Sequence, residues 1–316
     1  MRLVRFRSVL VLVTAAVLAA CTSSLPAAHV GATSEPGASG ELTSCGTLHP
    51  GKPIDPRAPL VVLVHGCNAS QGRFSALADL FELHGHQTLC FRYDDRRRVG
   101  EVAEELLSAL ARLAERRERT DLTVLGHSQG GLVARTALAL SAARPLDTLR
   151  GHLQMSLVTV SAPFNGIDAA ADCGSRWLHA ITFGATLAIC RAIAGPKWRD
   201  IHPHARLVER PEPLAVRVVS HLEIRTDERN TCRARRPDGR CGEDDYVFSI
   251  REQENAKVDH DQRVRRDTVA AGHAEIVGGD DAPPRKLLSV LQRHGVLNAT
   301  PADKQGELQA LLERLF

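Results

Sequence analysis

Ser128 has the residue type and the neighbours of a catalytic nucleophile. It lies in residues 126–130 (GHSQG), a G-x-S-x-G pattern that follows a short apolar run and precedes a helix-forming tract. A serine at a sharp corner between a strand and a helix needs neighbours without side chains, because the backbone passes close to it on both sides. The corner exposes the hydroxyl at a helix N-terminus, where partial positive charge favours a developing anion. The pattern therefore predicts that Ser128 attacks an acyl group.

A histidine is expected to act as the base, because a serine hydroxyl is a poor nucleophile until a base removes its proton. His273 lies among small residues in AGHAEIV, so its ring can project into a cleft. His260 is the alternative, but its acidic neighbours Asp259 and Asp261 favour a solvated surface position. The chain order nucleophile, acid, base that accompanies a G-x-S-x-G corner favours His273.

Three aspartates are candidates for the acid that orients the base. Asp245 precedes the run Tyr-Val-Phe, which suits a strand edge, and Asp244 is its neighbour. Asp227 ends the extension of a late strand. We expect Asp245 to orient His273, with Asp244 and Asp227 as alternatives. The two of these aspartates that do not orient the base are interpreted as surface charge.

Two backbone N–H groups are expected to bind the oxyanion of a tetrahedral intermediate. One belongs to Gln129, the residue after the nucleophile. The other lies on the loop after an early strand. His65 and Gly66 end such a strand, and the next N–H is that of Cys67.

These residues need a sheet that brings them together. Residues 60–64 (LVVLV) form a continuous apolar run, which is typical of a parallel strand buried on both faces. Further strands are predicted at 87–93, 122–125, 156–160 and 214–224, and helices at 72–83, 99–118, 284–294 and 305–316. The alternation of strands and helices predicts an α/β fold with a mostly parallel central sheet and right-handed crossovers. Residues 165–213 break the rhythm and are expected to form a small inserted cap.

Three segments resemble the α/β-hydrolase lipases and esterases of the bacterial triacylglycerol-lipase type: 63–66 (LVHG), 126–131 (GHSQGG) and 160–166 (VSAPFNG). Weaker likenesses lie at 200–203 and in the acid loop, 242–247, where Tyr246 replaces the family's usual glycine. The resemblance covers about residues 59–291. It implies an α/β-hydrolase fold and hydrolysis of carboxylic esters through an acyl-enzyme on Ser128. The family's calcium-site aspartates have no secure match, so we expect no metal and no cofactor.

Other activities fit the same catalytic residues. A phospholipase, a thioesterase or an acyltransferase would differ in the pocket rather than in the triad. A catalytically silent envelope-binding module is the non-enzymatic alternative, which the intact corner at Ser128 disfavours. An apolar tract at 177–193 of the cap fits an ester or lipid-like small-molecule substrate, and it equally fits packed core. No protein partner is implied.

The first residues are those of an export signal. Three arginines precede an apolar run at 9–20 that is too short for a stable membrane span. The sequence Leu-Ala-Ala-Cys that follows resembles a bacterial lipobox, which implies cleavage before Cys21 and lipidation of its sulfur. We therefore expect a signal peptide at 1–20, a flexible tether at 21–58 and a hydrolase domain at 59–316. The expected location is the envelope of a Gram-negative bacterium, with a lipid anchor in the membrane.

Cysteine usage and charge agree with export. Eight cysteines in an exported chain indicate an oxidising compartment. Two pairs that bracket local insertions are the expected disulfides, Cys173–Cys190 and Cys232–Cys241, while Cys45, Cys67 and Cys90 compete for a third. Three of the 40 basic residues lie in the leader, so the rest balance the 37 acidic ones. A neutral mature chain argues against general binding of nucleic acid.

Overall fold

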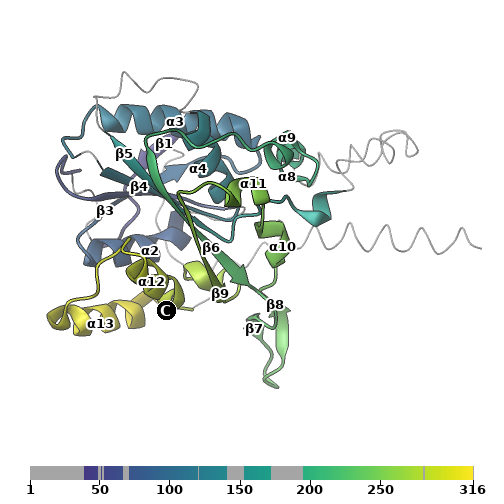
Figure 1. Ribbon diagram of the computed structural model, residues 1–316. Helices are drawn as coiled ribbons and strands as arrows, with labels where there is room; N and C mark the ends of the chain where they lie inside the picture. Colours follow the sequence, from purple (N-terminus) through teal and green to yellow (C-terminus); the bar gives the residue numbers. More distant parts are fainter. Residues whose placement is uncertain are drawn as a thin grey trace, which may run out of the picture.

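The computed structural model describes residues 39–48, 51, 53–66, 71–119, 121–140, 153–171, 195–279 and 282–315. Seven of its strands form one sheet in the order β1-β3-β2-β4-β5-β6-β9 (Figure 1). These strands are β1 (Glu41–Thr43), β2 (Leu60–Val64), β3 (Gln87–Arg92), β4 (Asp121–His127), β5 (Gln154–Val160), β6 (Val218–Asp227) and β9 (Val264–Ala270). Every neighbouring pair is parallel except β1 with β3. The mostly parallel sheet predicted from the sequence is therefore confirmed.

Helices cover both faces of this sheet (Figure 1). The longer ones are α2 (Gln71–Leu83), α3 (Val99–Ala114), α4 (Gln129–Leu140), α12 (Arg285–Arg293) and α13 (Gln305–Leu315). Short helical turns are α8 (Trp198–Ile201), α9 (Arg206–Glu209), α10 (Ile250–Gln253) and α11 (Ala256–Asp259), with 3-10 turns at Asp168–Ala170, Gly195–Lys197, Glu275–Val277 and Ala302–Lys304. In the described residues, no helix has the length and apolar character needed to cross a membrane.

Strand β2 is apolar at every position because both of its faces are buried. Leu60, Val62 and Val64 contact the apolar cluster under α3 and α4. Val61 and Leu63 belong to the second cluster, which contains residues of α2, α12 and α13. Because successive side chains of a strand point to opposite faces, a strand between two helical layers is apolar throughout.

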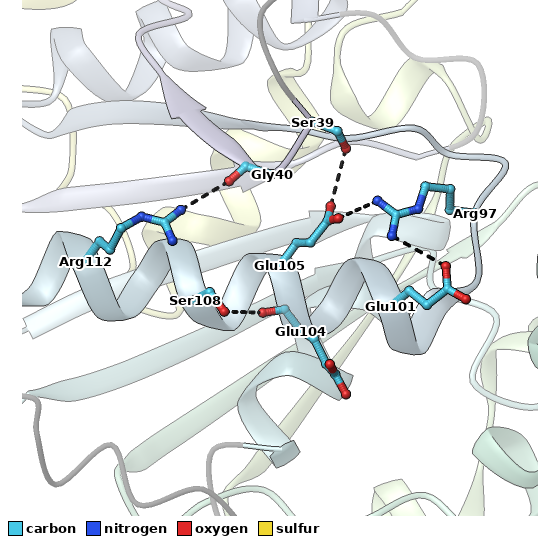
Figure 2. A pocket seen from close by; sticks show the side chains of 8 residues that line it. All are labelled: Ser39, Gly40, Arg97, Glu101, Glu104, Glu105, Ser108 and Arg112. Carbon is cyan, nitrogen blue, oxygen red and sulfur yellow. Dashed lines mark hydrogen bonds and ion pairs between the residues drawn. The ribbon is translucent and has the colours of Figure 1, made fainter.

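The end of the predicted tether, before β2, is partly structured. Strand β1 pairs with β3, with Glu41 opposite Arg92. Figure 2 shows how Ser39 and Gly40 lie against α3: the hydroxyl of Ser39 donates to Glu105, and Arg112 donates to the Gly40 carbonyl. The segment is rich in Ser and Gly and has no periodicity of its own, so its order comes from these tertiary contacts.

Two disulfides lie among the described residues. The Cys232–Cys241 bond confirms the expected pair and closes a hairpin of β7 (Cys232–Arg235) and β8 (Cys241–Asp244). Cys45 pairs with Cys90 of β3, which resolves the competition for the third bridge in that part of the chain. The remaining expected cysteine sites, at Cys21, Cys67, Cys173 and Cys190, lie outside the described residues, as do the leader and residues 172–194 of the expected cap.

The last part of the sheet differs from the prediction. The late strand β6 begins and ends a few residues after the predicted bounds, and β9 was not predicted at all. Strand β9 lies at the edge of the sheet and carries exposed polar residues such as Arg265 and Arg266. An edge strand with charged side chains lacks the apolar run by which buried parallel strands are recognised.

Candidate active site

Four neighbouring strands carry the polar side chains of the site at their carboxyl ends. Strands β4, β5, β6 and β9 are consecutive and parallel in the sheet. Ser128, Ser161 and Glu228 directly follow β4, β5 and β6, and His273 lies on the loop after β9. Because parallel strands end at the same edge of a sheet, residues far apart in the sequence meet there. Ligands of open α/β sheets bind at this edge.

Ser128 sits at the strained corner that the G-x-S-x-G pattern predicts. Its backbone has φ 57°, a left-handed conformation that is unusual for a residue with a side chain. Its N–H donates to the carbonyl of Val160 in the adjacent strand, at 2.9 Å, so the corner is held by the sheet. A Cβ on Gly66 would lie 2.7 Å from the Cβ of Ser128. The glycine thus lets the loop after β2 approach the serine.

His273 lies beside this corner and is fixed by its surroundings. Its carbonyl is 2.9 Å from Nε2 of His127, the residue before Ser128, and the two imidazole rings are 4.7 Å apart. The ring of Phe248 contacts the His273 ring edge-to-face at 4.9 Å. The base predicted from the sequence therefore contacts His127, the residue directly before the predicted nucleophile. His260, the alternative, is exposed on the turn after α11.

Glu228 occupies the position that the sequence analysis assigned to Asp245. One of its oxygens, Oε1, lies 2.9 Å from Nδ1 of His273, and the carboxylate is only 1% exposed. Its other oxygen accepts the N–H groups of Val247 and Phe248. Burial alone would raise the pKa of Glu228, but His273 and these N–H groups outweigh it and lower the pKa. Glu228 is therefore ionised at neutral pH and can orient the imidazole.

Asp245 has a different position, which corrects the expected acid. Its carboxylate accepts the N–H groups of Ala274 and Glu275 at 2.9–3.0 Å and pairs with Arg233 at 3.1 Å. Its carbonyl accepts the N–H of His273. Asp245 thus fastens the backbone on both sides of the histidine, while Glu228 contacts the ring.

The two other candidate acids also lie away from the ring. Asp227 pairs with Arg229 at the end of β6, and Asp244 is an exposed residue of β8. The alternative acid, Asp227, is the residue directly before Glu228, whose carboxylate contacts His273. Glu228 immediately follows β6, and this place directly after a strand was the sequence signal that could have identified it.

Ser161 is a further site residue, and it was not predicted from the sequence. It has φ 51°, so β5 ends in a second left-handed serine. Its hydroxyl lies 2.8 Å from Oε1 of Glu228 and 2.9 Å from Nδ1 of His273. The hydroxyl of Thr226 also donates to Oε1 at 2.8 Å. Two hydroxyls thus surround the hydrogen bond between the carboxylate and the imidazole.

The expected oxyanion-binding groups are only partly described. Gln129 begins α4 directly after Ser128, and its side-chain amide donates to the carbonyl of Asp95 at 2.9 Å. Cys67 lies outside the described residues. The residue before Gly66, His65, stacks on Tyr93 with ring centroids 4.3 Å apart. Burial lowers the pKa of His65, and its contact with the Gly66 carbonyl opposes this only in part.

The fold is that of the α/β-hydrolases. The lipase BlEst2 of Bacillus licheniformis, in its mature form, aligns with 81% of this chain and 98% of its own at 15% identity, with a TM-score of 0.52. Esterase B of Lactobacillus rhamnosis is also similar, with a TM-score of 0.48 and 13% identity over 82% of this chain and 81% of its own. Esterase 2 of Thermogutta terrifontis has a TM-score of 0.46 and 15% identity over 78% of this chain and 88% of its own.

Sequence comparison adds a family likeness. Residues 56–192 match the family described as "Putative serine esterase (DUF676)". This range contains Ser128 and Ser161 and ends before Glu228 and His273. No curated protein matches the sequence.

Proposed function

We propose that this protein is a serine esterase that hydrolyses carboxylic esters through an acyl-enzyme on Ser128. The observation that carries the proposal is the hydrogen bond between Glu228 and His273, on the same edge of the sheet as the strained corner at Ser128. A serine, a histidine and a carboxylate in these positions have the roles of a nucleophile, a base and an orienting acid. The likeness of residues 56–192 to a serine esterase family supports the same activity.

In the proposed reaction, Nε2 of His273 takes the proton of the Ser128 hydroxyl as its oxygen attacks the ester carbonyl. Glu228 stabilises the imidazolium that forms, and the N–H of Gln129, together with that of Cys67, binds the oxyanion. The intermediate collapses as His273 returns the proton to the departing alcohol. A water molecule, activated by the same imidazole, then releases the carboxylic acid and restores Ser128.

Labelling with a fluorophosphonate tests this proposal. We expect one phosphonyl adduct in the intact mass of the purified chain, and no adduct on Ser128→Ala. Ser161→Ala is the matched control, because it removes the other serine with a left-handed backbone. It is expected to be labelled on Ser128, more slowly. An adduct that persists on Ser128→Ala, or its absence from the folded wild-type chain, would contradict the assignment.

Ser161→Ala is also expected to lower kcat/KM for an ester such as 4-nitrophenyl butyrate by about 10- to 100-fold. This is the effect of losing one hydrogen bond to a charged group. Because the hydroxyl stabilises ionised Glu228, the acidic limb of the pH–rate profile should also shift. Ser156→Ala, which removes a hydroxyl on the same strand that pairs with Ser220, is the control. Equal rates and equal pH profiles for the two variants would exclude a role for Ser161.

We further propose that the protein is exported and held in the cell envelope by a lipid on Cys21. The Leu-Ala-Ala-Cys sequence after the apolar leader supports the anchor, and the Cys45–Cys90 and Cys232–Cys241 disulfides support an oxidising compartment. Metabolic labelling with a palmitate analogue should mark the wild-type chain and spare Cys21→Ser. A Cys21→Ser variant that is labelled equally would refute the anchor.

A further inference from the structure

A basic cavity lies at the end of the sheet opposite to Ser128. It has a volume of about 590 Å³ and lies near the amino ends of β6 and β9. Arg135 of α4, Lys257 and His260 from α11 and its end, and Arg263 before β9 contribute basic side chains to its lining, and Asp261 is acidic. Helix α4 begins beside Ser128 and runs away from the active site, so the cavity is separate from the site of ester hydrolysis.

Arg135 is a buried cation that is only 6% exposed. Its Nε has no hydrogen-bond partner among the described residues. In the described part of the chain no acceptor or carboxylate contacts its guanidinium. Burial lowers the pKa of Arg135 to about 10, which the more distant charges of Asp261 and Glu223 only partly oppose. An unpaired buried charge is costly to a fold, so its retention here indicates a ligand.

The polar cavity beside α3 provides a useful comparison. Its arginines are partnered within the chain: Arg97 contacts Glu101 and Glu105, and Arg112 donates to a carbonyl (Figure 2). Each arginine of that cavity therefore has a hydrogen-bond partner within the chain. Arg135 differs from these two arginines, because its Nε has no hydrogen-bond partner among the described residues.

The other cations of the basic cavity differ in how far they are neutralised. Arg263 is fully engaged, since it pairs with Asp261 and donates to the carbonyls of Leu214, Ala215 and Val218. Lys257 donates to a carbonyl, that of Glu209, and no carboxylate pairs with it among the described residues. Arg135 and Lys257 thus leave two positive charges at the cavity that no carboxylate of the described residues pairs with.

We propose that this cavity binds a phosphate group, with the guanidinium of Arg135 as its main ligand and the ammonium of Lys257 as the second. A guanidinium fork matches the geometry of a phosphate, and two uncompensated cations match its double charge. The phosphate could belong to a free phosphate compound or to a phospholipid headgroup. Both present the same chemistry to Arg135.

Isothermal calorimetry and thermal unfolding with inorganic phosphate, in a chloride buffer, test the site. We expect phosphate to bind the purified chain and to raise its Tm, because a ligand that binds only the folded state stabilises it. Arg135→Met should weaken this binding by about 10- to 100-fold, as expected for lost hydrogen bonds to a charged group. Without phosphate, its Tm should be equal to or above that of the wild type, because an unpaired buried charge has been removed.

The control is Arg236→Met, which removes an exposed arginine of the hairpin outside the cavity. It should bind phosphate like the wild type. Lys257→Ala is a second test that does not depend on a buried residue, and it should weaken binding without a change of fold. The absence of binding to the wild type, or equal binding by wild type, Arg135→Met and Lys257→Ala, would overturn the proposal.

A short-chain dialkyl ether analogue of phosphatidic acid, which contains no ester bond and is used below its micelle concentration, distinguishes the two sources of phosphate. Binding that is at least tenfold tighter than that of inorganic phosphate, and that is lost in Arg135→Met, would support the site and assign a lipid headgroup. Equal affinities would support the site for free phosphate compounds. None of these measurements uses ester hydrolysis, so the phosphate site and the proposed esterase activity can fail independently.

Discussion

Replacing Glu228 by glutamine is expected to lower kcat/KM for ester hydrolysis by about 10³- to 10⁴-fold, with little change of the fold. The carboxylate accepts from Nδ1 of His273 and is ionised, so it both selects the tautomer and stabilises the imidazolium. An amide in its place lacks the negative charge and can present an N–H to the ring, which favours the wrong tautomer. Steady-state kinetics on a soluble ester, with circular dichroism to verify folding, measures the effect.

Asp245→Asn is the matched control for this substitution. Asp245 accepts backbone N–H groups after His273 and pairs with Arg233, so the variant should lose stability and a smaller part of its activity. A folded Glu228→Gln enzyme with nearly full activity, beside an inactive and folded Asp245→Asn enzyme, would restore Asp245 as the orienting acid.

The same glutamate makes stability depend on pH. A carboxyl whose pKa is lower in the folded state than in the unfolded state stabilises the fold above its ordinary pKa, which is 4.5 here. That contribution is lost as the pH falls through the folded-state pKa. The difference in unfolding free energy between wild type and Glu228→Gln should therefore be larger at neutral pH than in acid.

Gly130→Ala is expected to destabilise the protein by about 3 kcal/mol. A Cβ at this position would lie 2.2 Å from the carbonyl oxygen of Val64 and 2.4 Å from that of His65. Both are backbone atoms at the end of β2, which cannot move aside like a flexible side chain. Helix α4 would have to shift away from β2, and Ser128 would shift with it. Urea unfolding measures the stability, and kcat/KM reports the displacement of the nucleophile.

Gly100→Ala provides the comparison within a helix. A Cβ on Gly100 of α3 would meet no atom within 4 Å, so alanine should stabilise the helix by about 0.5–1 kcal/mol. The two substitutions add the same methyl group, and only one of them adds it against a strand. Equal changes of unfolding free energy would show that the close approach at Gly130 is unimportant.

The parts of the fold that could be predicted are those whose signal is local. The glycines around Ser128 indicate that backbone segments pass close to one another there. The apolar sequence of β2 indicates that both faces of this strand are buried. Each pattern is contained within a few residues. The α/β class followed from the alternation of such segments, and the structure and its likeness to BlEst2 confirm it.

The acid could not be chosen in this way, because its identity depends on which side chain reaches a ring 45 residues away. Asp245 and Glu228 both lie on loops near His273. Only the tertiary structure shows that Asp245 contacts the backbone after His273 and that Glu228 contacts Nδ1 of its ring. Ser161 was quoted within a family-like segment, yet its hydroxyl acquires a role only once β5, β6 and β9 lie side by side. Strand β9 was missed because its charged edge resembles a loop.

If Cys21 carries a lipid, the disulfide between Cys45 and Cys90 limits how far the folded body can lie from the membrane. Strand β1 and this bond attach the chain to the sheet from Glu41 onward. If the lipid is on Cys21, about twenty residues connect the membrane to the folded body, and a fully extended chain of that length spans about 70 Å. Substrates in the anchoring membrane and its immediate surroundings would be within range, whereas those beyond this distance would have to diffuse to the enzyme.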